Sequence, residues 1–196
     1  MAGLARRLGG ILPHYAQIAW WGLAASQRPG RRPQTVLQAV ICSEWGVLLA
    51  VRSDLRGWEL PGGNPQAGEP DRDALLREVR EETGLEVAIE RRVGDYIRTG
   101  FGPYRARVFA CRPEGGSLRP SSETPVVRWF PPGAVPDTLF PWYRAPLADA
   151  LAGYPEPVLR RERQGLRWVL AGMAIDLRMR LSDDRAGLQP ARRGRV

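Results

Sequence analysis

The segment of residues 60–85 restricts the fold of this chain more than any other part of the sequence. It reads LPGGNPQAGEPDRDALLREVREETGL, a glycine-rich loop followed by a short acidic stretch and another glycine. Pro70 suits the first position of a helix, and acidic residues in the first turn, such as Asp71, favour the positive end of the helix dipole. Gly84 supplies the left-handed residue that commonly ends a helix. We therefore predict a helix over residues 70–83.

Three carboxylates share one side of this predicted helix. Glu78, Glu81 and Glu82 stand at positions i, i+3 and i+4, which places them within about 100° of arc. Like charges on adjacent turns repel, and a hard divalent cation such as Mg²⁺ would offset that repulsion through its preference for carboxylate oxygens. The alternative is a solvated acidic face that nearby Arg77 and Arg80 balance.

The spacing of these residues carries a family resemblance. It reads Gly, five residues, Glu, seven residues, then Arg-Glu-apolar-any-Glu-Glu-any-Gly-apolar, which matches the Nudix box at every position. The fixed residues are Gly63, Glu69, Arg77, Glu78, Glu81, Glu82 and Gly84, and the apolar ones are Val79 and Leu85. The chain resembles the Nudix hydrolase superfamily over about residues 35–150.

This resemblance implies an α+β fold, an α/β/α sandwich around a mixed β-sheet. The resemblance does not cover the flanks, where helical spacing of apolar residues predicts N- and C-terminal helical extensions. It implies hydrolysis of the pyrophosphate linkage in a nucleoside diphosphate joined to another moiety, such as a sugar or the ribose of ADP-ribose, with Mg²⁺ or Mn²⁺ as cofactor. The implied metal ligands are Gly63, through its carbonyl, and Glu78, Glu81 and Glu82. Glu69 and Arg77 match residues that orient the helix and its ligands.

The catalytic candidates are three glutamates, among which the general base stays open. Glu78 is the candidate base within the box, and Glu82 is the carboxylate on which we expect the reaction to depend. Glu123 precedes an apolar run and is the candidate base outside the box, because loop residues carried by a rigid sheet often have functional roles.

Residues that select the substrate are harder to find in the sequence. Arg52 is a candidate for pairing with phosphate, and Trp58 and Tyr104 are candidates for stacking on a nucleobase. For the arginine the alternative is a solvated strand residue, and for the aromatic side chains it is packing in the core.

The chain divides into three predicted parts. Residues 1–34 form an N-terminal helical extension and linker, residues 35–155 the Nudix hydrolase domain, and residues 156–196 a C-terminal helix and a basic disordered tail. An apolar stripe predicts the last helix at about 160–181; its residues are Leu166, Val169, Leu170, Met173, Leu177 and Leu181. A second helix is expected at 144–152.

Strands are expected between the linker and these helices. TVLQAVIC from Thr35 and GVLLAVR from Gly46 predict a hairpin, and WELPGG predicts a short extended piece before the box. After the box helix, EVAIERR, DYIRTG, YRARVFACR and VVRWF predict separate strands.

The distribution of charge along the chain limits the classes of binding partner. The net charge is +8, but its excess lies in the flanks, because residues 1–34 hold five arginines and no acid, whereas residues 35–150 hold fourteen arginines and sixteen acids. This distribution argues against nucleic acid as partner, whereas the resemblance implies a small nucleotide derivative as substrate and a homodimer. The basic flanks keep one alternative open, an RNA 5′-end pyrophosphohydrolase or RNA-binding protein, and a non-catalytic nucleotide-sensing module is another.

The compartment is expected to be the cytoplasm. Two cysteines make no disulfide framework, and no run of eighteen apolar residues predicts a transmembrane helix. The N-terminal apolar stretch is interrupted by Pro13, His14 and Gln17, which is atypical of a secretory signal.

Overall fold

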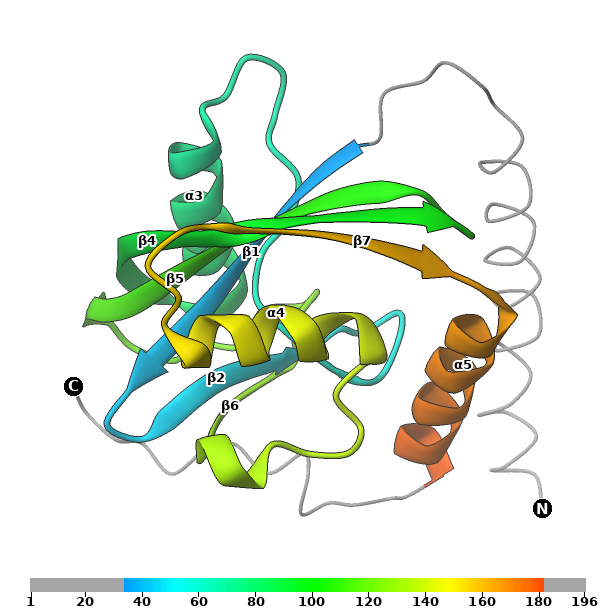
Figure 1. Ribbon diagram of the computed structural model, residues 1–196. Coiled ribbons are helices and arrows are strands. Elements are labelled where there is room, and N and C mark those ends of the chain that lie inside the picture. The colour runs from blue at the N-terminus through cyan, green and yellow to red at the C-terminus, as the bar shows by residue number, and fades with distance from the viewer. Residues whose placement is uncertain (1–33, 182–196) are drawn as a thin grey trace.

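The computed structural model describes residues 34–181, so the predicted N-terminal extension and basic tail lie outside the described residues. Within that range the chain forms a seven-stranded mixed sheet of order β3-β2-β1-β5-β4-β7, with β6 paired to β2. The helices α3 and α4 cover opposite faces of the sheet, and α5 stands at its end (Figure 1). The expected α/β/α arrangement is confirmed. The elements are β1 (Gln34–Ser43), β2 (Gly46–Val51), β3 (Trp58–Glu59), α3 (Asp71–Thr83), β4 (Leu85–Gly100), β5 (Tyr104–Gly116), β6 (Val126–Phe130), η1 (Pro132–Ala134), α4 (Pro141–Ala152), β7 (Val158–Gln164) and α5 (Leu166–Leu181).

Two apolar cores lie on the two faces of the sheet. In β1, Leu37 and Ile41 pack toward α3, whereas Val40 packs toward α4, as the alternation of side chains along a strand requires. Every residue of β2 is buried, because its odd residues face one core and Leu48 faces the other. A continuous apolar run is the expected composition for a strand covered on both faces.

The predicted hairpin is present but short. β1 and β2 pair antiparallel at Cys42 with Val47 and at Ser43 with Gly46. The rest of β1 then pairs parallel with β5, and β2 pairs antiparallel with β6. β1 and β2 therefore contact each other only at this end and have different partners along the rest of their length.

The segments EVAIERR and DYIRTG form one strand, β4, where separate strands were expected. The glycine between them does not make a turn. Gly94 instead pairs with Val158 of the neighbouring strand β7, where an added Cβ would be 2.3 Å from the carbonyl oxygen of Val158. A glycine inside a strand can mark the close approach of another backbone, and here the sequence alone did not distinguish that case from a turn.

The helix predicted at about 160–181 is wrong in its first turn and a half. Residues 158–164 form β7, which pairs parallel with β4 from Gly94 to Gly100, and α5 begins only at Leu166. Sheet pairing and one ion pair fix this segment as a strand: Arg160 donates to both carboxylate oxygens of Asp149 in α4, at 2.6 and 2.5 Å. The preceding helix, α4, is also longer than predicted, because it begins at Pro141.

The leucine stripe of α5 faces outward. Leu166 and Leu170 are more than half exposed, and the side of the helix that packs against the protein carries Gly172 and Asp176 instead. Gly172 is needed there because an added Cβ would lie 2.9 Å from the ring of Trp142. Docking of this helix therefore depends on a close approach and a buried carboxylate, and the predicted homodimer remains a prediction.

Replacing Asp149 by alanine is expected to lower the free energy of unfolding by about 2 kcal/mol. The change removes the carboxylate that Arg160 contacts and that accepts a 2.7 Å hydrogen bond from the hydroxyl of Tyr96. Denaturant titration measures the effect, with Arg161→Ala on the exposed side of the same strand as control. Equal stability of the two variants would show that this contact does not hold β7 in place.

Candidate active site

The loop before α3 is fixed against β1 by backbone hydrogen bonds. The amide of Ala39 donates to the carbonyl of Pro61, and the amide of Leu37 donates to the carbonyl of Gly63, both at 2.8 Å. Gly62 between them has a φ of +147°, and an added Cβ would lie 2.1 Å from the carbonyl oxygen of Leu37. Only glycine fits this position, so the loop passes directly along the sheet and into the start of the helix.

The helix α3 follows the prediction closely. It spans Asp71–Thr83, with Pro70 as its N-cap and Gly84 as its C-cap in the left-handed conformation, at a φ of 75°. Leu75 and Val79 are fully buried against the sheet. Burial of that apolar stripe turns the remaining side of the helix, which carries the acidic residues, toward the glycine-rich loop.

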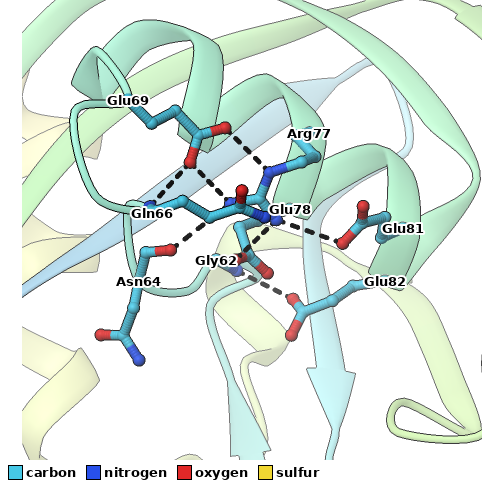
Figure 2. Close-up of polar contacts among 8 residues, drawn as sticks. All are labelled: Gly62, Asn64, Gln66, Glu69, Arg77, Glu78, Glu81 and Glu82. Atoms are coloured by element: carbon cyan, nitrogen blue, oxygen red, sulfur yellow. Dashed lines mark hydrogen bonds and ion pairs between the residues drawn. The ribbon is translucent and has the colours of Figure 1, made fainter.

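Arg77 connects this loop to the helix. Its guanidinium donates to both oxygens of Glu69, at 2.9 Å each, to Glu78 at 2.9 Å and to Glu81 at 3.2 Å (Figure 2). The contacts with Arg77 lower the pKa of Glu69 to about 2, aided by the amide of Gln66. Arg77 thus balances much of the repulsion within the acidic cluster, as the solvated-face alternative anticipated for this residue.

Glu82 lies apart from Arg77 and is buried. One of its carboxylate oxygens accepts a 2.9 Å hydrogen bond from the amide of Gly62 (Figure 2). Burial is the main cause that raises the pKa of Glu82 to about 7, against the opposing effects of the Gly62 hydrogen bond and the charge of Arg52, and the charges of Glu78 and Glu123 raise it further. Within residues 34–181, Glu82 therefore forms a hydrogen bond with a backbone amide but no ion pair with an arginine.

Gly63 lies directly against Glu78. A Cβ at this position would be 2.4 Å from the carboxyl carbon of Glu78, so the absence of a side chain leaves the space in which that carboxylate sits. The carbonyl of Gly63, which the family resemblance assigns as a metal ligand, already accepts the amide hydrogen of Leu37. Coordination through this oxygen would use its second lone pair.

Glu59 is a part of the site that sequence reasoning missed. It ends the two-residue strand β3, is 6% exposed, and accepts a 3.0 Å hydrogen bond from the hydroxyl of Tyr143 in α4. Burial raises the pKa of Glu59 to about 8, and the negative charge of Glu82 acts in the same direction. An acidic residue inside the apolar strand run WEL was the available signal, because buried acids are rare unless they are paired or functional.

The other candidates are divided between the site and the core. Glu123 is exposed in the loop before β6, and its charge reaches Glu82. Arg52 ends up near the carboxylates, since its charge lowers the pKa of both Glu59 and Glu82. Trp58 is 4% exposed and packs edge-on against Phe130, so the packing alternative describes its position.

Tyr104 lies away from the acidic cluster, at the start of β5. Its hydroxyl accepts a hydrogen bond from the buried Arg98. Its ring lines a mostly apolar cavity of about 280 Å³ with Trp142 and Trp168. Within residues 34–181, the main groups that act on the hydroxyl of Tyr104 are Arg98, Gln164 and Glu162, none of which belongs to the acidic cluster.

The carboxylates of α3 and the carbonyl of Gly63 are oxygen ligands of the kind that a hard divalent cation prefers, but the acidic side chains do not converge on a common point. Among residues 34–181, no three acidic, histidine or cysteine side chains converge closely enough to hold an ion as they stand. Arg77 holds Glu78 and Glu81, and Glu82 is turned to Gly62. The cradle at Gly63 and the raised pKa of Glu82 nevertheless fit a bound cation, because carboxylate oxygens are its preferred ligands and it would favour the ionised form of Glu82.

Comparison with known proteins identifies the family of this chain. The sequence model of the NUDIX domain matches residues 32–172, a range that includes β7 and the start of α5. A MutT-like protein of Streptomyces ambofaciens is 40% identical over 134 residues, covering 68% of this chain and 85% of that protein. A putative 8-oxo-dGTP diphosphatase of Bacillus subtilis is 34% identical over 95 residues, covering 48% and 64%.

Solved structures share the fold. The crystal structure of an ADP-ribose pyrophosphatase from Streptococcus suis matches with a TM-score of 0.55 and 27% identity, covering 67% of this chain and all of that one. A NUDIX hydrolase from Nitrosomonas europaea matches with a TM-score of 0.61 at 22% identity, covering 68% and 81%, which supports the fold alone. Within the described residues, no helix is long and apolar enough to cross a membrane.

Replacing Gly63 by alanine is expected to displace the Glu78 carboxylate and to weaken Mn²⁺ binding about tenfold or more, with little loss of stability. The new methyl group would overlap the end of a flexible side chain, which can move without disturbing the backbone. Isothermal titration calorimetry with Mn²⁺ and thermal unfolding test both parts. Gly133→Ala, where no atom lies within 4 Å of the added Cβ, is the control. Unchanged Mn²⁺ affinity would show that this carboxylate does not bind the ion.

The cation-free protein is expected to lose stability as the pH rises from about 4.5 through 8. The pKa of Glu59 is raised in the folded state, so its contribution is complete below the unfolded value of 4.5 and is lost as the carboxyl ionises near pH 8. Glu59→Gln, which stays neutral, should show a smaller fall in Tm between pH 6 and 9 in EDTA. Parallel Tm curves for the two proteins would contradict the assignment.

Proposed function

The chain belongs to the NUDIX domain family and is a Nudix-type pyrophosphohydrolase, and from this premise we propose that it cleaves the pyrophosphate linkage of a nucleoside diphosphate derivative with Mg²⁺ or Mn²⁺. The observation that carries the proposal is the complete Nudix box folded so that a buried carboxylate, Glu82, meets the glycine-rich loop at Gly62. Relatives named 8-oxo-dGTP diphosphatase and ADP-ribose pyrophosphatase support two substrate classes, a modified nucleoside triphosphate and a nucleoside diphosphate sugar.

We assign the metal ligands to residues of the loop and the helix. Glu78, Glu81 and Glu82 would supply carboxylate oxygens, and the carbonyl of Gly63 would complete the set. A bound divalent cation would supply charge neutralisation at the phosphoryl oxygens and a lowered pKa for an attacking water. Arg77 then keeps its contacts with Glu69, so the loop and the helix stay in register when Glu78 and Glu81 turn to the ion.

Two glutamates are candidates for the general base. Glu78 contacts Arg77, which holds its carboxylate in a defined position beside Gly63. Glu123 is exposed in the loop before β6, its backbone carbonyl accepts the amide hydrogen of Ser53, and its charge acts on Glu82. Either carboxylate would remove a proton from water, and the pH dependence of kcat in Glu78→Gln and Glu123→Gln separates the two.

Glu82→Gln is expected to lower kcat by roughly 100-fold or more, since it removes a ligand charge while the amide can still accept the hydrogen bond from Gly62. The substrates are nucleoside diphosphate sugars, ADP-ribose, dinucleoside polyphosphates, nucleoside triphosphates and 8-oxo-dGTP. The assay measures the inorganic phosphate that a coupling phosphatase releases from the products, and EDTA provides the metal-free arm. Glu90→Gln, an exposed residue of β4, is the control. Full activity of Glu82→Gln, or activity that survives EDTA, would remove the proposed mechanism.

A further inference from the structure

The outward side of α5 carries an apolar surface, which we call the leucine face. It consists of four leucines that are between 38% and 72% exposed, namely Leu166, Leu170, Leu177 and Leu181. They stand at positions i, i+4, i+11 and i+15, which places them within about 60° of arc around the helix. Exposed leucines aligned in this way form one contiguous surface, and contiguous apolar surfaces mark interaction sites.

Contacts on another side of α5 fix the leucine face in this outward orientation. The helix stands at the end of the sheet (Figure 1), where the fully buried Asp176 accepts a 2.6 Å hydrogen bond from the amide of Arg56. Gly172 lies so close to Trp142 that an added Cβ would be 2.9 Å from its ring. Turning the leucines toward the sheet would break both contacts, so a partner has to reach the leucine face from outside.

The first described residue of the chain lies close to α5. Trp168 and Met173 of α5 line the apolar cavity of about 280 Å³ together with Tyr104 of β5. Tyr104 is the register partner of Gln34, the residue at which β1 begins. The segment that precedes β1 is therefore attached to the sheet beside the helix that carries the leucine face.

The sequence of that preceding segment is apolar enough to need a partner surface. Residues 8–27 contain no Asp, Glu, Lys or Arg. Within this stretch apolar residues recur at helical spacing and two tryptophans are adjacent; these residues are Ile11, Tyr15, Ile18, Trp20 and Trp21. Large apolar side chains gain free energy when they leave water, and an uncharged stretch has few groups that favour exposure.

The connection between this segment and β1 has the length that docking on α5 requires. Residues 28–34, RPGRRPQ, separate the two, and seven extended residues span about 23 Å. The 16 residues of α5 make a helix about 24 Å long. A segment attached beside Tyr104 can therefore lie along the leucine face without any change in the sheet.

We propose that the leucine face is the docking surface for residues 11–25 of the same chain, which pack their apolar side chains against α5. Two observations favour this occupant over a second copy. A short linker gives the tethered segment an effective concentration on the order of millimolar, which a separate molecule does not reach. In addition, α5 holds three arginines and one aspartate, so two copies of α5 would bring like net charges together, whereas residues 11–25 add no charge.

Hydrogen exchange of the full chain, followed by mass spectrometry, tests the docking from both sides. The double variant Trp20→Ser, Trp21→Ser removes large apolar side chains from the segment and should speed exchange of the α5 amides about fivefold or more, because the helix loses its cover. Unchanged exchange in α5 would overturn the proposal.

The reverse experiment changes α5 and measures the segment. Leu170→Gln together with Leu177→Gln should speed exchange of the amides in residues 11–25 about fivefold or more, since docking stabilises both partners equally. Leu151→Gln replaces a leucine of α4 that is 43% exposed, and this control should leave exchange in residues 11–25 as in the wild type. Equal exchange in the α5 variant and the control would contradict the proposal.

Dilution and lipid vesicles distinguish the chain's own segment from other occupants. Docking within one chain does not depend on protein concentration, so exchange in residues 11–25 of the wild type should be the same after about tenfold dilution. Protection that is lost on dilution would assign the leucine face to a second copy. Protection that arises only with phosphatidylglycerol vesicles would assign it to a lipid surface. Either of these two results would overturn the proposal.

Discussion

Arg77 joins the two halves of the acidic site, and the rest of the centre is arranged around its contacts. It engages Glu69 from the loop and Glu78 and Glu81 from the helix, so one guanidinium fixes the loop to α3 and offsets repulsion between carboxylates. Glu82 lies beyond its reach and instead accepts a backbone amide hydrogen. The result is a site with one compensated group of acids and one buried acid whose charge needs a further partner.

The sheet supplies the rigid frame for this arrangement. Backbone bonds from β1 to the carbonyls of Pro61 and Gly63 hold the loop in place, and burial of Leu75 and Val79 fixes the rotation of α3. Glu59 of β3 also belongs to these surroundings, and its carboxylate accepts a hydrogen bond from the hydroxyl of Tyr143 in α4. Both layers of helices therefore contribute to the surroundings of the carboxylates, which explains why the complete sandwich is needed to build the site.

The C-terminal part has a different role from the one its leucines indicated. Its apolar stripe resembles a core-facing helix, yet Leu166 and Leu170 are exposed and the anchor is Asp176. A buried carboxylate satisfied by a backbone amide and an arginine can hold a helix at a defined position, which apolar contacts specify less strictly.

Local interactions let the sequence alone determine the loop, the helix from Asp71 to Thr83 and its end at Gly84. Proline, the dipole and a left-handed glycine act within a few residues, and the box spacing places Glu78, Glu81 and Glu82 on one short element. Tertiary structure alone decided that residues 158–164 are a strand and that the charge of Glu59 acts on Glu82. Those outcomes depend on partners such as β4 and Tyr143, which are distant in the chain, so no local sequence pattern could predict them.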